Sequence, residues 1–171
     1  DDTDTLNLWK DELARDQGFK VVFLGDSVVH GGGVPSEDQT IPSYLAHHLG
    51  SLLPDRELAV HNFSLPGCTP ADTLNILRFI IDAGPDLVVS RAFASLADFA
   101  AAAAAIAGRG TRLLAMKGAR PDAEIEELEA RGLPWRVAAI ESLDVPGLDA
   151  RRCAVILETR RNLPLPNPTE P

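Results

Sequence analysis

Short apolar segments alternate with amphipathic segments along most of the chain. Runs of strand length, rich in β-branched and other apolar residues, occupy residues 20–24, 57–62, 86–90 and 111–116. Segments with apolar residues at helical spacing occupy residues 6–16, 36–53, 69–84, 95–107 and 121–130. Two further strands are predicted at residues 135–143 and 153–157, and no helix separates them.

This alternation predicts an α/β fold, a three-layer αβα sandwich of the Rossmann or flavodoxin-like type with a mostly parallel sheet. The last two strands lack a crossover helix, so we expect them to be antiparallel. We predict one domain over residues 1–158. The proline-rich segment 159–171 is expected to form a mobile tail.

Composition is that of an ordinary globular protein, but the charge is unevenly placed. The chain has 171 residues, of which 45% are apolar and 24% charged. All of the net charge of −9 falls in residues 1–88, which carry 5 basic and 14 acidic side chains, whereas residues 89–171 carry 11 of each. Nucleic-acid affinity is dominated by contacts to phosphates, so this balance predicts that a nucleic-acid partner is unlikely.

Two further features bear on location and chemistry. No apolar run approaches the length of a membrane span, and the acidic start is unlike a signal peptide, so we expect no membrane association and a cytoplasmic location. The two cysteines, Cys68 and Cys153, are too few for a disulfide framework or a metal site, and no metal is expected.

The first predicted strand ends abruptly in Gly25-Asp26-Ser27, and three adjacent glycines, Gly31, Gly32 and Gly33, follow. Ligands of open parallel sheets bind at the carboxyl ends of the strands, so Ser27 stands where a nucleophile would stand. The alternative is that Asp26 and Ser27 only cap the next helix, as Asp and Ser often do. The glycine cluster could bind a small anion.

Three segments in this region occur together in order: 25–33, which contains Gly-Asp-Ser, 38–46, and 62–69, which reads Asn-Phe-Ser-Leu-Pro-Gly-Cys-Thr. Residues 20–89 therefore resemble the first half of an SGNH (GDSL-type) hydrolase. The resemblance implies that Ser27 is the nucleophile within the Asp26-Ser27 block. It also implies that Gly67 lends its backbone N–H to an oxyanion hole and that Asn62 belongs to the same site.

The second half of that family's site is missing. No Gly-x-Asn-Asp follows the third strand, and no Asp-x-x-His occurs near the C-terminus, because the last of the four histidines is His61. A serine needs a base within hydrogen-bond reach to become a strong nucleophile. His30 could serve only if the glycine loop folded back, and we expect it to face water instead.

Residues 86–158 resemble a different family. The segments 88–99, 112–118 and 145–152 look like the C-terminal half of the glucose-inhibited-division protein B family, which are S-adenosylmethionine-dependent methyltransferases of guanine N7 in small-subunit ribosomal RNA. The resemblance implies that Arg91 and Lys117 lie on the cofactor and RNA side of the sheet. That family's Asp-x-Gly-x-Gly-x-Gly loop and the acid that ends its second strand are absent here, where the second strand ends at Asn62.

The chain thus has the pattern of a hybrid joined near residues 85–90, a fusion or a chimera of two families. In both families the strand at the junction lies beside the first strand, which implies the strand order 2-1-3-4-6-5. The main functional prediction is an SGNH-like serine esterase scaffold of weak or no activity, with a small ester or anion as its ligand and no cofactor. One alternative is a methyltransferase-like protein that uses S-adenosylmethionine, and another is an α/β module without catalysis.

Overall fold

The structure is a computed structural model that describes residues 2–160 except 26, 68, 80–83, 92–94, 105, 109 and 145–148. The helices are α1 (Asp2–Arg15), α2 (Ser27–His30), α3 (Ile41–Leu52), α4 (Pro70–Phe79), α5 (Leu96–Ala103) and α6 (Asp122–Ala130), with a 3₁₀ turn η1 (Glu37–Gln39). The strands are β1 (Phe19–Leu24), β2 (Leu58–Asn62), β3 (Leu87–Arg91), β4 (Arg112–Lys117), β5 (Trp135–Leu143) and β6 (Arg152–Thr159). The expected proline-rich tail, apart from its first two residues, lies outside the described residues.

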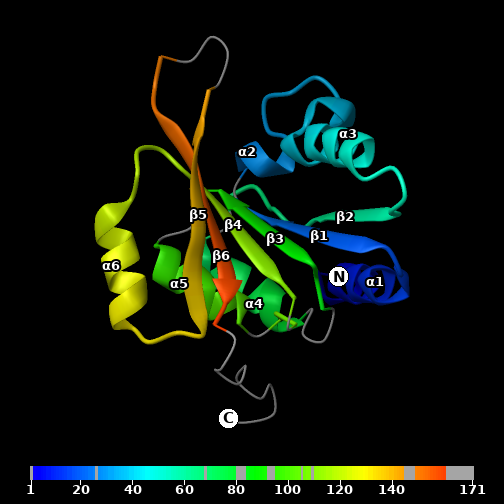
Figure 1. Cartoon of the computed structure of the whole chain (residues 1–171). Helices are drawn as coiled ribbons and strands as arrows, with labels where there is room; N and C mark the ends of the chain where they lie inside the picture. The colour runs from blue at the N-terminus through cyan, green and yellow to red at the C-terminus, as the bar shows by residue number, and fades with distance from the viewer. Residues whose placement is uncertain are drawn as a thin grey trace.

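These strands form one six-stranded sheet in the order β2-β1-β3-β4-β6-β5, which confirms the predicted order (Figure 1). Strands β2, β1, β3 and β4 are parallel, whereas β6 is antiparallel to both β4 and β5. Sheet pairing passes without a break from β1 to β3 and from β3 to β4. The two segments that resemble different families therefore share one sheet.

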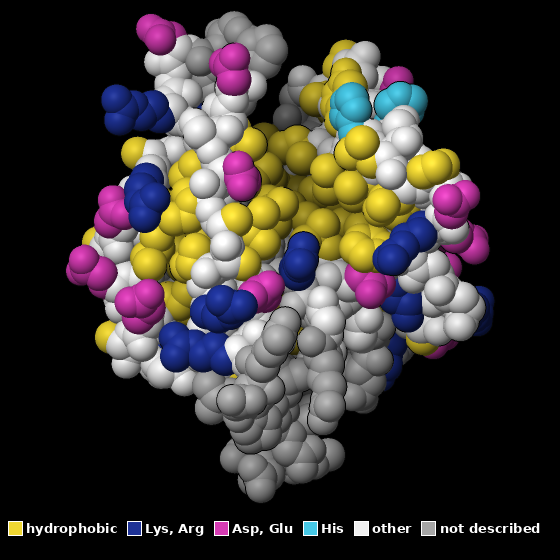
Figure 2. Space-filling view, viewed as in Figure 1, with side chains coloured by type: hydrophobic (Ala, Val, Ile, Leu, Met, Phe, Trp, Pro, Cys, Tyr) yellow, Lys and Arg dark blue, Asp and Glu magenta, His cyan; other side chains and the backbone are white. Residues whose placement is uncertain are grey.

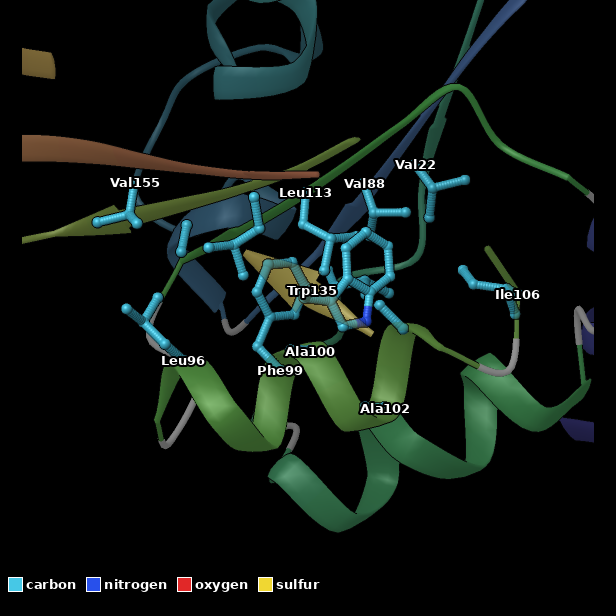
Figure 3. Packing of buried hydrophobic residues seen from close by; sticks show 14 of the residues in the cluster. Val22, Val88, Leu96, Phe99, Ala100, Ala102, Ile106, Leu113, Trp135 and Val155 are labelled. Atoms are coloured by element: carbon cyan, nitrogen blue, oxygen red, sulfur yellow. The ribbon is translucent and has the colours of Figure 1, made fainter. Parts of the chain in front are cut away.

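One face of the sheet carries the larger core. Residues from α1, α4, α5 and α6 pack there against every strand from β1 to β6, and Trp135 and Phe99 are among the largest fully buried side chains (Figure 3). The alanine-rich α5 contributes Ala100, Ala102 and Ala103, which have small side chains and let the helix lie close to the sheet. The predicted alanine-rich helix is thereby confirmed, although α5 ends four residues earlier than expected.

The opposite face is covered over only part of its width. Val21, Phe23, Val29 and Val89 are buried there beneath α2 and α3. Over β4, β6 and β5 the same face has no helix in the described part of the chain, and hydrophobic side chains line a hollow between the β5–β6 hairpin and the α2–α3 layer (Figure 2). Tyr44 of α3 is 56% exposed, whereas Leu45 and Leu49 of the same helix pack against this small cluster.

Capping side chains explain where the helices begin. Thr40 accepts a hydrogen bond from the backbone N–H of Ser43 at the start of α3, and Ser95 does the same for Asp98 at the start of α5. Proline at the second position of α3 adds to this start signal. The helix predicted to open at residue 36 therefore begins at Ile41, and a 3₁₀ turn precedes it.

Strand β5 contains a bulge. Val137 pairs with Leu157 and Ala139 with Ile156, so Ala138 has no partner in the register. The extra residue lets both Val137 and Ile140 pack against the larger core, although they are three residues apart. Without the bulge, strict alternation would place them on opposite faces.

Candidate functional site

The chain reverses sharply where β1 ends. A Cβ atom added to Gly25 would lie 2.6 Å from a side-chain methyl of Val29 and 3.2 Å from the backbone oxygen of Arg91. Only glycine therefore allows α2 and β3 to approach this point so closely. The short helix α2 begins at Ser27, at the carboxyl end of β1. Asp26 and the side chain of Ser27 lie outside the described residues, so the role of Ser27 as a nucleophile stays a prediction.

A pocket of about 720 Å³ lies at the carboxyl ends of β1 and β2. This is the end of a parallel sheet at which ligands bind, and the volume is that of a small-molecule site. Its lining residues come from the glycine loop, η1, α3 and β2: His30, Gly31, Gly32, Val34, Pro35, Ser36, Glu37, Thr40, Pro42, Ser43, Ala46, Val60 and Asn62. Of the predicted binding residues, the structure brings Gly31, Gly32 and Asn62 together here.

The glycine loop is packed against α3 and is not an open anion cradle. Gly31 has a φ of +109°, and a Cβ there would lie 2.7 Å from a methyl of Thr40. Its N–H donates to the carbonyl of Val28. Gly33 has a φ of +90° but does not line the pocket. Gly31 is thus needed for the turn and its contact with Thr40, and its amide is already used within the protein.

Asn62 and His30, which both line the pocket, form hydrogen bonds that connect α2 with the loop after β2. The Asn62 side chain donates to the carbonyl of Val29 (3.3 Å) and accepts from the N–H of Ser64 (3.1 Å). His30 Nδ1 lies 2.8 Å from the carbonyl oxygen of Ser64. A carbonyl only accepts, so Nδ1 carries the proton and Nε2 of the neutral ring is left as an acceptor. His30 was expected to be a loop side chain facing water; it ends α2 and is exposed, but its ring is anchored.

The side chain of His61 lies on the face of the sheet opposite to the pocket. Its Nε2 lies 2.7 Å from Oδ2 of Asp16, and its ring stacks on Phe63 at 5.9 Å. In the register His61 pairs with Val22, which belongs to the larger core. This contact binds the end of α1 to β2, and it directs His61 away from the pocket.

The remaining predicted residues are dispersed. Gly67 occupies an exposed turn with a φ of +73°. Arg91 and Lys117 end neighbouring strands, but Arg91 belongs to the face covered by α3 and Lys117 to the face covered by α5 and α6. Lys117 Nζ bonds Oε2 of Glu124 at 2.7 Å, and the same oxygen accepts the N–H of Leu96 at 2.8 Å. Lys117 therefore helps to hold α5 and α6 in place.

Comparison with known proteins gives sequence relatives named ribosomal RNA small subunit methyltransferase G. No family model matches the chain. It is 51% identical over 77 residues to the ribosomal RNA small subunit methyltransferase G of Bordetella petrii, covering 43% of this chain and 28% of that protein. The proteins of the same name from Bordetella bronchiseptica (53% over 70 residues, 41% and 33%) and Ralstonia nicotianae (50% over 74 residues, 43% and 32%) are similar. The chain spans about a third of the length of these curated relatives.

Several solved structures align with the chain. TesA aligns with a TM-score of 0.46 at 24% identity, covering 65% of this chain and 67% of that one. AlinE4, an SGNH-hydrolase family esterase, aligns with a TM-score of 0.40 at 20% identity (70% and 57%). A putative class I S-adenosylmethionine-dependent methyltransferase from Listeria monocytogenes aligns with a TM-score of 0.47 at 11% identity (98% and 62%).

These findings favour the methyltransferase alternative over the main prediction of a hydrolase. The sequence relatives carry the methyltransferase name at 43–53% identity, whereas the hydrolases are similar only in structure. The resemblance to a family of small-subunit ribosomal RNA methyltransferases is thereby supported. The resemblance of residues 20–89 to SGNH hydrolases stays a prediction.

Two expectations are corrected. No cofactor was expected, but the relatives are named methyltransferases, and transfer of a methyl group requires a methyl donor. A nucleic-acid partner was judged unlikely, but the same relatives are named for ribosomal RNA. The argument from charge failed because net charge is a sum over the whole chain, and residues 89–171 are electrically neutral as a group. RNA contact depends on where basic side chains lie, not on that sum.

The position and volume of the pocket suit a nucleoside methyl donor. The acidic residue that the family resemblance leads one to expect at the end of β2 is not there. Asn62 stands at that position, with its amide bonded to backbone. Glu37, from η1, is the acidic residue among those that line this pocket. Glu37 and His30 were not predicted as binding residues, because each reaches the pocket through tertiary packing. The pattern that could have indicated them is a polar segment at a helix start that faces the end of a strand.

None of the helices in the described part of the chain combines the length and apolar character needed to cross a lipid bilayer.

Proposed function

We propose that this chain is a methyltransferase-related α/β protein that binds S-adenosylmethionine in the pocket at the ends of β1 and β2 and contacts small-subunit ribosomal RNA. One observation carries the proposal: identity of about half over 70–77 residues with proteins named ribosomal RNA small subunit methyltransferase G. The pocket position supports it, because nucleotide-type cofactors bind at this end of doubly wound sheets.

In this proposal the protein supplies binding and orientation. S-adenosylmethionine supplies an electrophilic methyl group when bound. The pocket residues hold the nucleoside part, and basic residues of the second half contact phosphates. Residues 20–89 and 90–158 form the two halves of one domain, as the continuous pairing from β1 through β3 to β4 supports.

The experiment is a methyl-transfer assay with isotope-labelled S-adenosylmethionine and small ribosomal subunits that lack the guanine-N7 modification. The expected result is label in the ribosomal RNA above a control without protein. Calorimetry with S-adenosylhomocysteine separates cofactor binding from transfer. No binding at millimolar cofactor together with no transfer would contradict the proposal.

A second candidate is an acyl hydrolase with Ser27 as its nucleophile. It is favoured by the start of α2 at Ser27, directly after the tight reversal at Gly25, and by the positive φ of Gly67. A fluorophosphonate probe tests it: labelling of the wild type that disappears in Ser27→Ala would support an active serine. Equal labelling of both proteins, or of neither, would remove this candidate.

A further inference from the structure

The polar groups of the pocket divide into those already bonded within the protein and those left for a ligand. The Asn62 amide is bonded to the backbone at both ends. Ser43 Oγ donates to the carbonyl of Glu37 at 2.7 Å, and Thr40 Oγ1 lies within donating distance of the same carbonyl (2.9 Å) and of Ser43 Oγ (3.0 Å). The hydroxyl protons of Ser43 and Thr40 are therefore used in hydrogen bonds that join the 3₁₀ turn to the start of α3.

Glu37 and His30 supply acceptors at the pocket, and Ser36 adds a hydroxyl group that can donate or accept. Glu37 is one of the residues that line the pocket, and the internal hydrogen bonds given above go to its backbone oxygen, which leaves its exposed carboxylate available to a ligand. His30 presents Nε2 as an acceptor, because the carbonyl of Ser64 holds the proton on Nδ1. Both acceptors call for hydrogen-bond donors on the ligand.

The negative charge of Glu37 disfavours an anion in this pocket and favours a ligand with hydroxyl or amino groups. A phosphate would meet the Glu37 carboxylate, and the Gly31 amide that could hold it is bonded to Val28. A nucleoside offers the required donors, with two ribose hydroxyls and, in adenosine, an exocyclic amine. Carboxylates bind ribose hydroxyls in other doubly wound folds.

We propose that Glu37 binds the ribose hydroxyls of an adenosine-type ligand in this pocket, with His30 Nε2 as a second acceptor, in place of the acid that is absent from the end of β2. The inference rests on the proposed function, since the ligand is then the nucleoside part of the methyl donor. The acidic balance of residues 1–88 agrees with it, because S-adenosylmethionine is a cation overall.

The test is calorimetric titration of the full chain with adenosine, 2′,3′-dideoxyadenosine and S-adenosylhomocysteine. The wild type is expected to bind adenosine on the order of tenfold or more tightly than the dideoxy compound, since a hydrogen bond to a charged group is lost. In Glu37→Gln this preference should fall to a few-fold or less. Asp38→Asn is the matched control, because Asp38 lies in the same turn, is exposed and does not line the pocket.

Three outcomes overturn the inference, and they are distinguishable from failure of the proposed function. If the ligands bind but Glu37→Gln keeps the wild-type preference, the inference is wrong while cofactor binding stands. If inorganic phosphate displaces adenosine, the site is an anion site. If the wild type binds neither adenosine nor S-adenosylhomocysteine at millimolar concentration, both proposals fail. Thermal unfolding of each variant shows whether it is folded, and Glu37, an exposed side chain, is expected to leave folding unchanged.

Discussion

The two faces of the sheet differ in how completely they are covered. One face is packed against α1, α4, α5 and α6 from the first strand to the last, and its core includes fully buried tryptophan, phenylalanine and leucine side chains. The other face has a small buried cluster under α2 and α3, beside which lie the pocket and the apolar hollow of Figure 2. The comparison indicates that stability comes mainly from the first face, which leaves the second face free to serve binding.

The largest expected change in the free energy of unfolding comes from comparing alanine variants of two neighbouring residues in β4. Leu113 is fully buried in the larger core, whereas Leu114 points to the other face and is half-buried. Leu113→Ala should lower the free energy of unfolding by about 2–5 kcal/mol, and Leu114→Ala by less than about half as much. Urea unfolding followed by tryptophan fluorescence measures both. Equal losses would mean that the second face is covered in solution.

A smaller loss in the free energy of unfolding is expected at the contact that holds α5 and α6 against the first face of the sheet. Glu124→Gln leaves the ammonium of Lys117, a side chain only 14% exposed, without its charged partner. We expect a loss of about 1–3 kcal/mol in the free energy of unfolding. Glu126→Gln, on the exposed side of the same helix, is the control and should stay near the wild type.

A double variant sharpens this second prediction. Lys117→Met removes the ammonium, so adding it to Glu124→Gln should cost less than the two single changes summed. Strict additivity would show that the ion pair does not hold the two helices.

The attachment of α1 should be weaker still. Asp16→Ala removes the carboxylate that lies 2.7 Å from His61, and we expect a loss of about 1 kcal/mol together with faster amide hydrogen exchange in α1. Asp11→Ala, an exposed acid on α1, is the matched comparison. If both variants behave alike, apolar packing, including that of Leu13 and Trp9, holds the helix without the Asp16–His61 contact.

The smallest effect concerns the start of α4. Hydrogen bonds from the hydroxyl and the backbone N–H of Thr69 lower the pKa of Asp72 below its ordinary value. Since the pKa is lower in the folded state, the contribution to stability is present above the ordinary pKa and is lost as pH falls through the folded one. Thr69→Val removes the hydroxyl, so an NMR titration of the Asp72 carboxyl should give a higher pKa than in the wild type. An unchanged pKa would mean that the hydroxyl does not bond the carboxylate.

Strands were predictable from the sequence to within about two residues, because apolar runs bounded by Gly, Pro and Asp have few alternatives. Helix starts were less so: the segment expected to open at residue 36 begins at Ile41, where Thr40 caps it. Strand order followed from resemblance to known families, since periodicity says nothing of which strands are neighbours.

The site was predictable only where its residues follow a strand directly. Asn62 ends β2, and Gly31 and Gly32 belong to the connection that follows β1, separated from that strand only by the short helix α2, so all three lie at the pocket. The anchoring of His30 depends on Ser64, 34 residues away, and no local pattern reports such a contact. Lys117 appeared as a charge at a strand end, but its partner Glu124 is on a helix whose orientation the sequence does not specify.

The unpaired residue in β5 has a consequence for how this strand can be compared between relatives. Ala138 divides β5 into two stretches of opposite phase: Trp135 and Val137 contact the larger core before it, and Ile140 does so after it. A sequence alignment without a gap at this position would match residues that face the core in one protein with residues that face away from it in another. A one-residue gap belongs at this position, and a relative that lacks the extra residue should have exchanged polar and apolar positions along one of the two stretches.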